Sequence, residues 1–144
     1  ADSENLPAYQ VLQPEYSLVS RASFEGPLQR LCIDKNIGVV TYFALASGFL
    51  SGKYRSLDDL QGQARGGMAK KYIENGGLQV LEAMDDIANS KNITLAELAI
   101  AWLLHRDGVT APIASATKES HLKSLVKASE VSLTPEEVEA LAVF

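Results

Sequence analysis

Residues 27–42, PLQRLCIDKNIGVVTY, join a helix-forming pattern directly to a strand-forming one. In the first half, Leu28, Leu31 and Cys32 recur at helical spacing, and Pro27 suits the first turn of a helix. The second half, IGVVTY, is β-branched and apolar, as in a strand that is buried on both faces. This combination of a helix and a buried strand predicts an α/β fold.

An earlier strand completes a structural unit. Residues 9–12 form a short apolar run that Pro14 halts, so we expect a strand at residues 10–13. Strand, helix and strand then occupy about 35 residues, the size of a βαβ unit, in which the two strands run parallel. APIA, at residues 111–114, predicts a third short strand. We therefore expect a parallel sheet in which residues 10–13, 37–42 and 111–114 are adjacent in that order.

Residues 43–77 interrupt this alternation. They contain seven of the ten glycines of the chain, and residues 55–76 have few apolar anchors. Long segments without secondary structure are uncommon in compact domains and are usually functional or disordered. We expect no regular structure here, and we expect residues 55–76 to be the most mobile part of the chain when no ligand is bound.

The remainder of the chain predicts further helices. Two of them begin with a capping box, formed by Thr94 with Glu97 and by Thr134 with Glu137. Apolar residues at helical spacing give each helix a face that should be buried. These faces contain Val80, Leu81, Met84, Ile87 and Ala88 in the first helix after the loop, Leu95, Leu98, Ala99, Trp102 and Leu103 in the second, and Leu122, Leu125 and Val126 in the third.

Three short parallel strands leave both edges of their sheet unpaired. A complete α/β domain usually has more strands, so we expect this chain to be the end of a larger unit. Its helices should cover one face of the sheet and leave a sheet edge open.

The composition limits the class of protein. The chain has 144 residues, 47% of them hydrophobic, and a net charge of −5, as in one ordinary globular domain or part of a larger one. The negative charge gives no support for binding to nucleic acid or to a membrane surface. No run of about 18 apolar residues is present, and residues 1–9 are polar, unlike a signal peptide. With a single cysteine, Cys32, no internal disulfide is possible, and the cytoplasm is expected.

Two turns rich in small residues each contain a cation. FALASGFLSGK (residues 43–53) follows the second predicted strand and ends in Lys53, and SATKES (residues 115–120) follows the third and contains Lys118. Ligands of α/β folds bind at the carboxyl ends of parallel strands, and a helix that begins at the second turn, capped by Thr117, would attract phosphate. The pattern predicts an anionic ligand. The alternative is a pair of ordinary surface turns, because neither matches a GxxxxGKS/T or GxGxxG phosphate loop.

Four segments together resemble the carboxyl-terminal half of an aldo-keto reductase. They are QPEYSLVSR (13–21), VVTYFALASGFLSGKYR (39–55), ARGGM (64–68) and APIASATKESHL (111–122). The resemblance implies an eight-stranded (β/α) TIM barrel that binds NADP(H) at its strand ends and reduces aldehydes or ketones to alcohols. It also implies that the three predicted strands are the sixth, seventh and eighth, so that residues 1–144 form one unit that carries much of the cofactor site.

The resemblance assigns two residues to the nicotinamide end of the cofactor. Gln13 would hydrogen-bond the carboxamide, and Tyr42 would stack under the ring and leave its other face free for hydride transfer. Leu45 and Ser47 would line the pyrophosphate, mainly through their backbone groups. The alternatives are a polar strand end that faces water for Gln13 and a core aromatic residue for Tyr42.

Cationic residues would hold the phosphates. By the same resemblance, Lys53 would pair with the pyrophosphate or help to close the loop over it, and Arg65 would belong to that covering loop. The adenosine 2′-phosphate would be held by Ser115, Thr117, Lys118 and His121. For both lysines the alternative is an ordinary solvated side chain.

Four positions depart from the pattern of the family. Many relatives have Ser-Pro or Tyr-Ser where this chain has Phe43 and Ala44, which removes one hydroxyl contact to phosphate. His121 occupies a place often held by Gln or Arg, and Leu125 replaces a common Asn that contacts adenine. These differences concern the affinity for the cofactor more than the fold.

The catalytic groups of the family are not expected in this chain. The family's reaction uses a Tyr as general acid, supported by a Lys, a His and an Asp, and all four come from the first four strands. We therefore assign no catalytic residue and expect the chain alone to be inactive. His105 and His121 have no catalytic partners, and the sequence contains no apparent Ser-His-Asp set or metal-ligand spacing.

The predicted function is that of an NADP(H)-dependent oxidoreductase acting on a small carbonyl compound, completed by the amino-terminal half of the barrel. A first alternative is a non-catalytic nucleotide-binding or scaffolding module on the same fold, which the absence of the Tyr-Lys-His-Asp set upstream would favour. A second is a self-sufficient small α/β domain unrelated to the family, which a cooperative melt of the 144-residue chain as a monomer would favour. The substrate and the oligomeric state stay open.

Overall fold

The computed structural model describes residues 4–143, with the backbone alone for Val143. The predicted limits of the unit, residues 1 and 144, and part of the polar amino-terminal segment lie outside this range. The elements in chain order are β1 (Val11–Leu12), α1 (Pro27–Asp34), β2 (Gly38–Thr41), the 3-10 helices η2 (Ala46–Ser51) and η3 (Asp58–Leu60), α2 (Gly66–Glu74), α3 (Gly77–Lys91), α4 (Leu95–Leu104), β3 (Ala111–Pro112), α5 (Glu119–Ala128), α6 (Pro135–Ala140) and η4 (Leu141–Val143).

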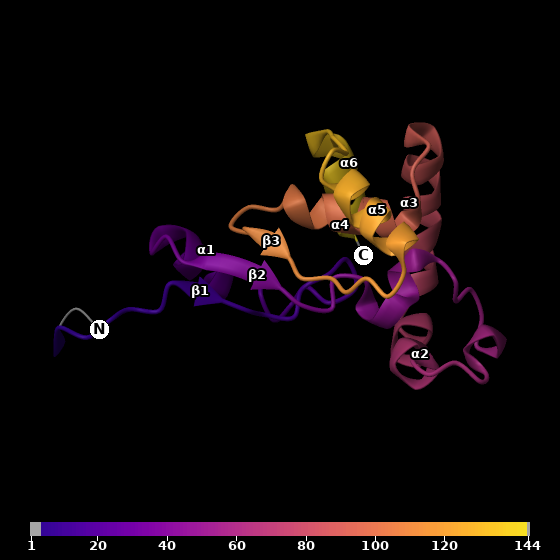
Figure 1. Ribbon diagram of the computed structural model, residues 1–144, viewed down its shortest axis with the longest axis horizontal. Coiled ribbons are helices and arrows are strands. Elements are labelled where there is room, and N and C mark those ends of the chain that lie inside the picture. The colour runs from indigo at the N-terminus through magenta and orange to yellow at the C-terminus, as the bar shows by residue number, and fades with distance from the viewer. Residues whose placement is uncertain (1–3, 144) are drawn as a thin grey trace.

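The sheet has the strand order β1-β2-β3, and neighbouring strands are parallel (Figure 1). Val11 of β1 lies opposite Gly38 of β2, and Val40 of β2 lies opposite Ala111 of β3. This arrangement confirms the predicted order and direction of the strands. β1 and β3 are shorter than predicted, because the prolines that follow β1 and end β3 lack the N–H group that a longer ladder requires.

Both outer strands have a single neighbour within residues 4–143, so the predicted open edge is present in this part of the chain. Apolar side chains lie exposed at both edges. Tyr9 and Val11 are 91% and 56% exposed at β1, and Ile113 is 44% exposed just after β3. Figure 1 shows the segment before β1 running away from the sheet, while α3, α4, α5 and α6 gather together.

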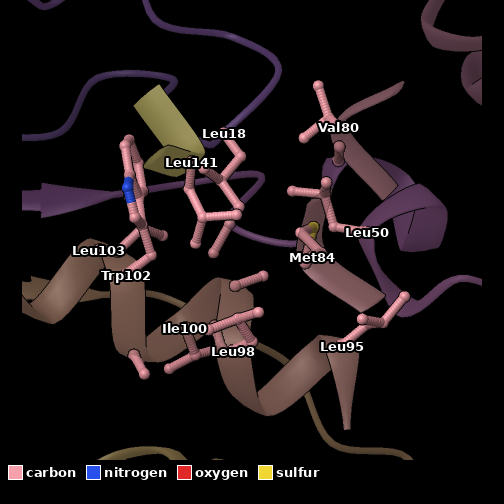
Figure 2. Packing of buried hydrophobic residues seen from close by; sticks show 14 of the residues in the cluster. Leu18, Leu50, Val80, Met84, Leu95, Leu98, Ile100, Trp102, Leu103 and Leu141 are labelled. Carbon is pink, nitrogen blue, oxygen red and sulfur yellow. The ribbon is translucent and has the colours of Figure 1, made fainter. Parts of the chain in front are cut away.

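The core is built around α4, whose residues are enclosed on nearly every side. Leu98, Trp102 and Leu103 are fully buried, and Figure 2 shows them close to Leu18 and Leu141, which come from distant parts of the chain. Burial of one such side chain contributes about 1.5–3 kcal/mol to stability. The predicted apolar face of α4 is confirmed. The residues between those positions are buried as well, so the helix is covered beyond that face.

Both predicted capping boxes are present. Thr94 Oγ1 accepts the N–H of Glu97 at 3.2 Å, and Glu97 Oε2 accepts the N–H of Thr94 at 2.8 Å. Thr134 and Glu137 form the same pair of bonds at the start of α6, at 3.3 and 2.8 Å. These bonds satisfy N–H groups that the first turn of a helix leaves without partners.

The apolar faces of the other helices are covered to different degrees. That of α3 is buried as predicted, with Ile87 partly enclosed. The prediction for α5 is wrong at Leu122 and Val126, which are each 55% exposed, whereas Leu125 packs partly buried against the core. In α1, Cys32 is buried but Leu31 is 48% exposed. Helical spacing identifies an apolar stripe, but it does not tell which part of the stripe another element covers.

The prediction that residues 43–77 lack regular structure is wrong. This segment contains η2, η3 and α2, and α2 buries Ala69 and Tyr72. Glycine at position 66 allows α2 to begin against η3, since a Cβ on Gly66 would clash with the carbonyl oxygen of Leu60. This glycine therefore permits close packing at a helix start. The expected mobility of residues 55–76 stays a prediction.

Candidate functional site

The carboxyl ends of the three strands meet at one edge of the sheet. Tyr42, just after β2, donates its N–H to the carbonyl oxygen of Pro14 at 3.0 Å, which places it beside the end of β1. On its other side, Ile113 donates its N–H to the carbonyl oxygen of Thr41 at 2.7 Å. Gln13 and the segment that leads to Ser115 therefore flank Tyr42, at the edge where α/β folds bind ligands.

Gln13 and Tyr42 both reach solvent at this edge. Gln13 is exposed, and Tyr42 is 37% exposed. The ring of Tyr42 lies 5.2 Å from the ring of Phe43, measured between centroids. A core position, which was the alternative for Tyr42, does not describe this half-open ring, and a flat ligand could stack on its exposed part.

The turn after β2 has an unusual backbone. Phe43, Ala46 and Ser47 have positive φ angles of 57°, 47° and 58°, and Gly48 follows at 89°. For residues other than glycine this conformation costs on the order of 1–3 kcal/mol each, and such strain gathers at ligand sites. The turn is closed by its own hydrogen bonds, in which Ala46 and Gly48 donate their N–H groups to the carbonyl oxygens of Phe43 and Leu45 at 2.7 and 2.8 Å.

Leu45 and Ser47 present backbone groups more than side chains. Leu45 packs against the core, and its carbonyl oxygen accepts the N–H of Gly48 at 2.8 Å. Ser47 is 5% exposed, and its Oγ lies 3.9 Å from the Sδ of Met68 in α2. Both positions are compatible with ligand contacts through the backbone, which is the kind of contact that the resemblance implies.

Lys53 lies back over this turn. A Cβ added at Gly48 would lie 3.1 Å from Lys53 Cε and 3.2 Å from its Nζ, so a larger residue at position 48 would crowd the lysine. The same Nζ lies 4.6 Å from the centre of the Tyr54 ring. The structure thus brings the ammonium group of Lys53 to the positive-φ turn, and together they form a small cationic site.

Arg65 lies farther along, at the start of α2. It is the N-cap residue of that helix, and its carbonyl oxygen accepts the N–H groups of Met68 and Ala69. Its side chain is exposed. Met68, one helical turn after Arg65, contacts Ser47 and so joins α2 to the Lys53 turn.

The second predicted phosphate site surrounds the start of α5. Ser115, Thr117, Lys118 and His121 are exposed, and Thr117 Oγ1 lies 3.4 Å from His121 Nδ1. The prediction that Thr117 caps this helix is wrong, because the helix begins at Glu119 and the extended Lys118 is its N-cap residue. No side-chain cap occupies the first turn, so the N–H groups of Glu119 and Ser120 stay available to an anion, while that of His121 donates to the carbonyl oxygen of Lys118 at 3.1 Å.

The Lys53 turn and the residues at the start of α5 are not bonded to each other. Within residues 4–143, no hydrogen bond or ion pair connects the Lys53 turn with the segment 115–121. The surface has a recess of about 520 Å³ on α3 and another of about 370 Å³ between residues 18–22 and the α2–α3 junction. None of the predicted site residues lines either recess. The strand-end site is thus an open surface in the described part of the chain.

A polar cluster beside Trp102 escaped the sequence reasoning. Tyr16 donates its hydroxyl to Glu25 at 2.6 Å, and Glu25 pairs with Arg21 at 2.8 Å and with Arg106 at 3.3 Å. Burial and the bond to Glu25 raise the pKa of Tyr16. Burial alone would raise the pKa of Glu25, but hydrogen bonds from Arg21 and Tyr16 hold it below its ordinary value. Tyr16 is fully buried and its hydroxyl is bonded to both Glu25 and Arg106, so this cluster is structural.

An ion pair beside Lys53 was missed as well. Arg55 Nη1 and Nη2 lie 2.7 and 2.8 Å from the two carboxylate oxygens of Asp85. Asp59 accepts the backbone N–H groups of Arg55 and Ser56, at 2.8 Å each. Asp85 lies on α3, 30 residues after Arg55, so no local pattern could have indicated the pair. Asp side chains often accept nearby backbone N–H groups in turns, so the sequence could have indicated the bonds of Asp59 but not the ion pair.

Residues 4–143 contain neither a candidate metal site nor a helix suited to span a bilayer. No group of three or more His, Cys, Asp or Glu side chains is placed to hold a metal ion there. Over the same residues, none of the helices combines the length and apolar character needed to cross a bilayer.

Comparison with known proteins places the chain in a family. A sequence model of the aldo/keto reductase family matches residues 2–143. The chain is 33% identical over 139 residues to a probable voltage-gated potassium channel subunit beta from Oryza sativa subsp. japonica, covering 91% of this chain and 42% of the relative. It is 33% identical over 129 residues to the aldo-keto reductase yakc, NADP(+), from Schizosaccharomyces pombe, covering 85% and 38%. L-glyceraldehyde 3-phosphate reductase from Escherichia coli is 27% identical over 122 residues, covering 81% and 35%.

A solved structure supports the same fold. A thermostable aldo-keto reductase in complex with the inhibitor epalrestat superimposes with a TM-score of 0.68 at 22% identity, covering 92% of this chain and 38% of that chain. The chain therefore spans 35–42% of the length of the three curated relatives described above. Its α/β fold with a parallel sheet matches that of an aldo-keto reductase, and the chain belongs to the aldo/keto reductase family.

Proposed function

We propose that this chain is the carboxyl-terminal part of an aldo-keto reductase barrel and carries much of its NADP(H) site. The observation that carries the proposal is the contact of Lys53 with the turn at Gly48, where a cation and several positive-φ residues meet at a strand end. The complete protein would then reduce a small aldehyde or ketone to an alcohol. The family membership supports an oxidoreductase, and the strand-end geometry supports an anionic cofactor.

The nicotinamide end of the cofactor would lie at the sheet edge. Gln13 would hydrogen-bond the carboxamide, and the half-exposed ring of Tyr42 would stack on the nicotinamide. The pyrophosphate would lie against the backbone of Leu45 and Ser47, with Lys53 as the cation. Arg65 would close over it from the start of α2. The side chains of Gln13, Tyr42, Lys53 and Arg65 are exposed, as their assignments require.

The adenosine end would lie at the start of α5. Lys118 and His121 would contact the 2′-phosphate, joined by the hydroxyl groups of Ser115 and Thr117 and by the uncapped N–H groups of the first turn. This part of the proposal selects NADP(H) over NAD(H), because only NADP(H) carries a phosphate at that position.

The bound cofactor supplies the hydride, and the residues of this chain bind and orient it. Tyr16 does not have the surroundings of a general acid, because its side chain is buried and its hydroxyl is bonded to Glu25. We therefore place the proton donor in another part of the barrel, and we expect this chain alone to have no reductase activity.

Cofactor titration of the complete protein tests the proposal. Lys53→Gln should weaken NADPH and NADH equally, by about tenfold, because both share the pyrophosphate and a hydrogen bond to a charged group is worth about 1.5–3 kcal/mol. Lys70→Gln, at an exposed lysine on α2, is the matched control and should leave both affinities unchanged. If the unaltered protein shows no saturable quenching of its fluorescence by NADPH, the proposal is wrong.

A second candidate function is a nucleotide-binding or scaffolding module without turnover. The observation that favours it is the similarity to proteins described as probable potassium channel subunits, one of which covers 91% of this chain. The two candidates differ in one measurement on the complete protein. Consumption of NADPH in the presence of a panel of small aldehydes and ketones supports the enzyme, and tight binding of NADPH without consumption supports the module.

A further inference from the structure

The segment that follows Lys53 is tied to α3 by a two-pronged ion pair. Arg55 Nη1 and Nη2 bind the two carboxylate oxygens of Asp85 at 2.7 and 2.8 Å, and its Nε binds the carbonyl oxygen of Gly52 at 3.1 Å. All three donor nitrogens of the guanidinium are therefore engaged. The bidentate geometry fixes the direction of Arg55 as well as its distance from α3.

The backbone around Arg55 is closed into a turn. Asp59 accepts the N–H groups of Arg55 and Ser56. It lies within η3, whose last residue, Leu60, packs against the core. Bonds from the backbone of Arg55 and from Ser56 lower the pKa of Asp59, so its carboxylate is the charged acceptor that this turn needs. The turn and the ion pair thus hold Arg55 from both its backbone and its side chain.

Lys53 lies directly between fixed positions. Gly52 is held by the guanidinium of Arg55, and Tyr54 is 2% exposed within the core. The ammonium of Lys53 lies 4.6 Å from the Tyr54 ring and beside Gly48. Release of Arg55 from α3 would therefore loosen Gly52 on one side of Lys53, whereas the core still holds Tyr54 on the other side.

The face of α3 that receives Arg55 is acidic. Glu82, Asp85 and Asp86 line the same recess on that helix, and hydrogen bonding to Asp85 together with the charge of Glu82 raises the pKa of Arg55. The side chains of Arg55 and Asp85 are 41% and 40% exposed. Ion pairs open to water to this degree are weak and reversible, so this contact can open without unfolding the chain.

We propose that the pair Arg55–Asp85 is a latch that holds residues 52–60 against α3 and positions Lys53 for its anionic ligand. Arg55 is a positioning residue, which acts through Lys53 without touching the ligand. The role of Lys53 toward the cofactor rests on the proposed function, whereas the latch itself does not. An open latch gives the segment freedom to leave the ligand, so its main effect falls on the rate of ligand release.

Hydrogen exchange in the ligand-free complete protein tests the latch directly. Arg55→Gln should speed exchange of the amides of residues 53–60 about three- to fivefold, as expected for loss of one exposed ion pair. Asp85→Arg should do the same. The combined variant Arg55→Glu, Asp85→Arg restores an ion pair with reversed charges and should return exchange to within about twofold of the original rate. Unchanged exchange in both single variants overturns the proposal.

Release of NADPH tests the positioning of Lys53. In stopped-flow measurements, Arg55→Gln should raise the dissociation rate about three- to fivefold with little change in the association rate, and the charge-reversed pair should recover most of this effect. Glu74→Gln, which breaks a more exposed ion pair on α2, is the control and should change neither exchange nor release. If Arg55 only stabilised the fold, Arg55→Gln would lower the melting temperature without raising the dissociation rate of NADPH relative to its association rate.

The outcomes separate the latch from the proposed function. Faster exchange in a protein that binds no NADPH supports the latch and contradicts the cofactor site. Faster exchange with unchanged release from a protein that does bind NADPH overturns the positioning of Lys53. Unchanged exchange overturns the latch, whatever the protein binds.

Discussion

The N–H of Leu133 points at Nε2 of His105, 3.3 Å away, and joins the α5–α6 connection to the end of α4. On the other side of the ring, Nδ1 lies 2.8 Å from the carbonyl oxygen of Ala101. A backbone N–H can only donate, so Nε2 is the acceptor and the ring carries its proton on Nδ1, which donates to Ala101. His105 is thus a structural bridge, which agrees with the absence of catalytic partners in its sequence surroundings.

This geometry predicts the tautomer of His105. Nitrogen-detected NMR of the ring at neutral pH should show the proton on Nδ1 and none on Nε2. His105→Ala should lower the free energy of unfolding by about 1–3 kcal/mol, because the N–H of the nearly buried Leu133 loses its partner. His121→Ala, at an exposed ring on α5, is the control and should cost less than about 0.5 kcal/mol. A proton found on Nε2 would contradict the bridge.

The sequence predicts a buried apolar face for both α4 and α5, but truncation of a leucine should cost far more stability in α4 than in α5. Leu98 of α4 is fully buried, and Leu98→Ala should lower the free energy of unfolding by about 2–5 kcal/mol because it leaves a cavity in the core. Leu122 of α5 is 55% exposed, and Leu122→Ala should cost less than about 1 kcal/mol. Urea denaturation of the complete protein measures both. An equal cost at the two positions would mean that the outer face of α5 is covered in the complete protein.

Much of the fold was predictable because its signals are local. The apolar, β-branched run IGVVTY predicts a buried strand from its own residues, and a capping box needs only Thr94 and the Glu97 three positions later. Parallel pairing follows from the helix between the first two strands, since strands in that arrangement cannot form a hairpin.

The rest depends on partners that are distant in the sequence. The partial exposure of α5 follows from where other elements pack, and the pair Arg55–Asp85 joins residues 30 positions apart. Positive φ angles at Phe43 and Ser47 could not be predicted, because side chains other than glycine seldom adopt them. At the candidate site, the residue types could be proposed from the resemblance, but the contact of Lys53 with Gly48 required the structure.

Acid should weaken the protein partly through Glu25. Its pKa in the folded chain lies below the ordinary value of 4.5, so the unfolded chain binds more protons near that pH. The stability that Glu25 contributes is therefore present above about pH 4.5 and is lost as pH falls through its lower folded pKa. Glu25→Gln should be less stable than the original protein at pH 7, and it should lose less stability between pH 7 and about pH 3. Urea denaturation at both pH values measures this, with Glu74→Gln as an exposed control.

The final prediction concerns the phosphate at the start of α5. If Lys118 contacts the adenosine 2′-phosphate, Lys118→Glu in the complete protein should weaken NADPH by roughly ten- to a hundredfold and leave NADH nearly unchanged, since a charge-assisted contact contributes about 1.5–3 kcal/mol. His121→Ala should act in the same direction. Fluorescence titration with both cofactors measures the difference.

The matched control for this change is Lys123→Glu, which reverses a charge on the next turn of the same helix, where Lys123 pairs with Glu119 at 2.8 Å. It alters the net charge equally but lies beyond the first turn, so it should affect NADPH far less than Lys118→Glu does. Equal losses of NADPH and NADH in Lys118→Glu would assign the contact to the shared pyrophosphate or to the fold. No loss of either would identify Lys118 as a solvated lysine, and the preference for NADP(H) would then need another source.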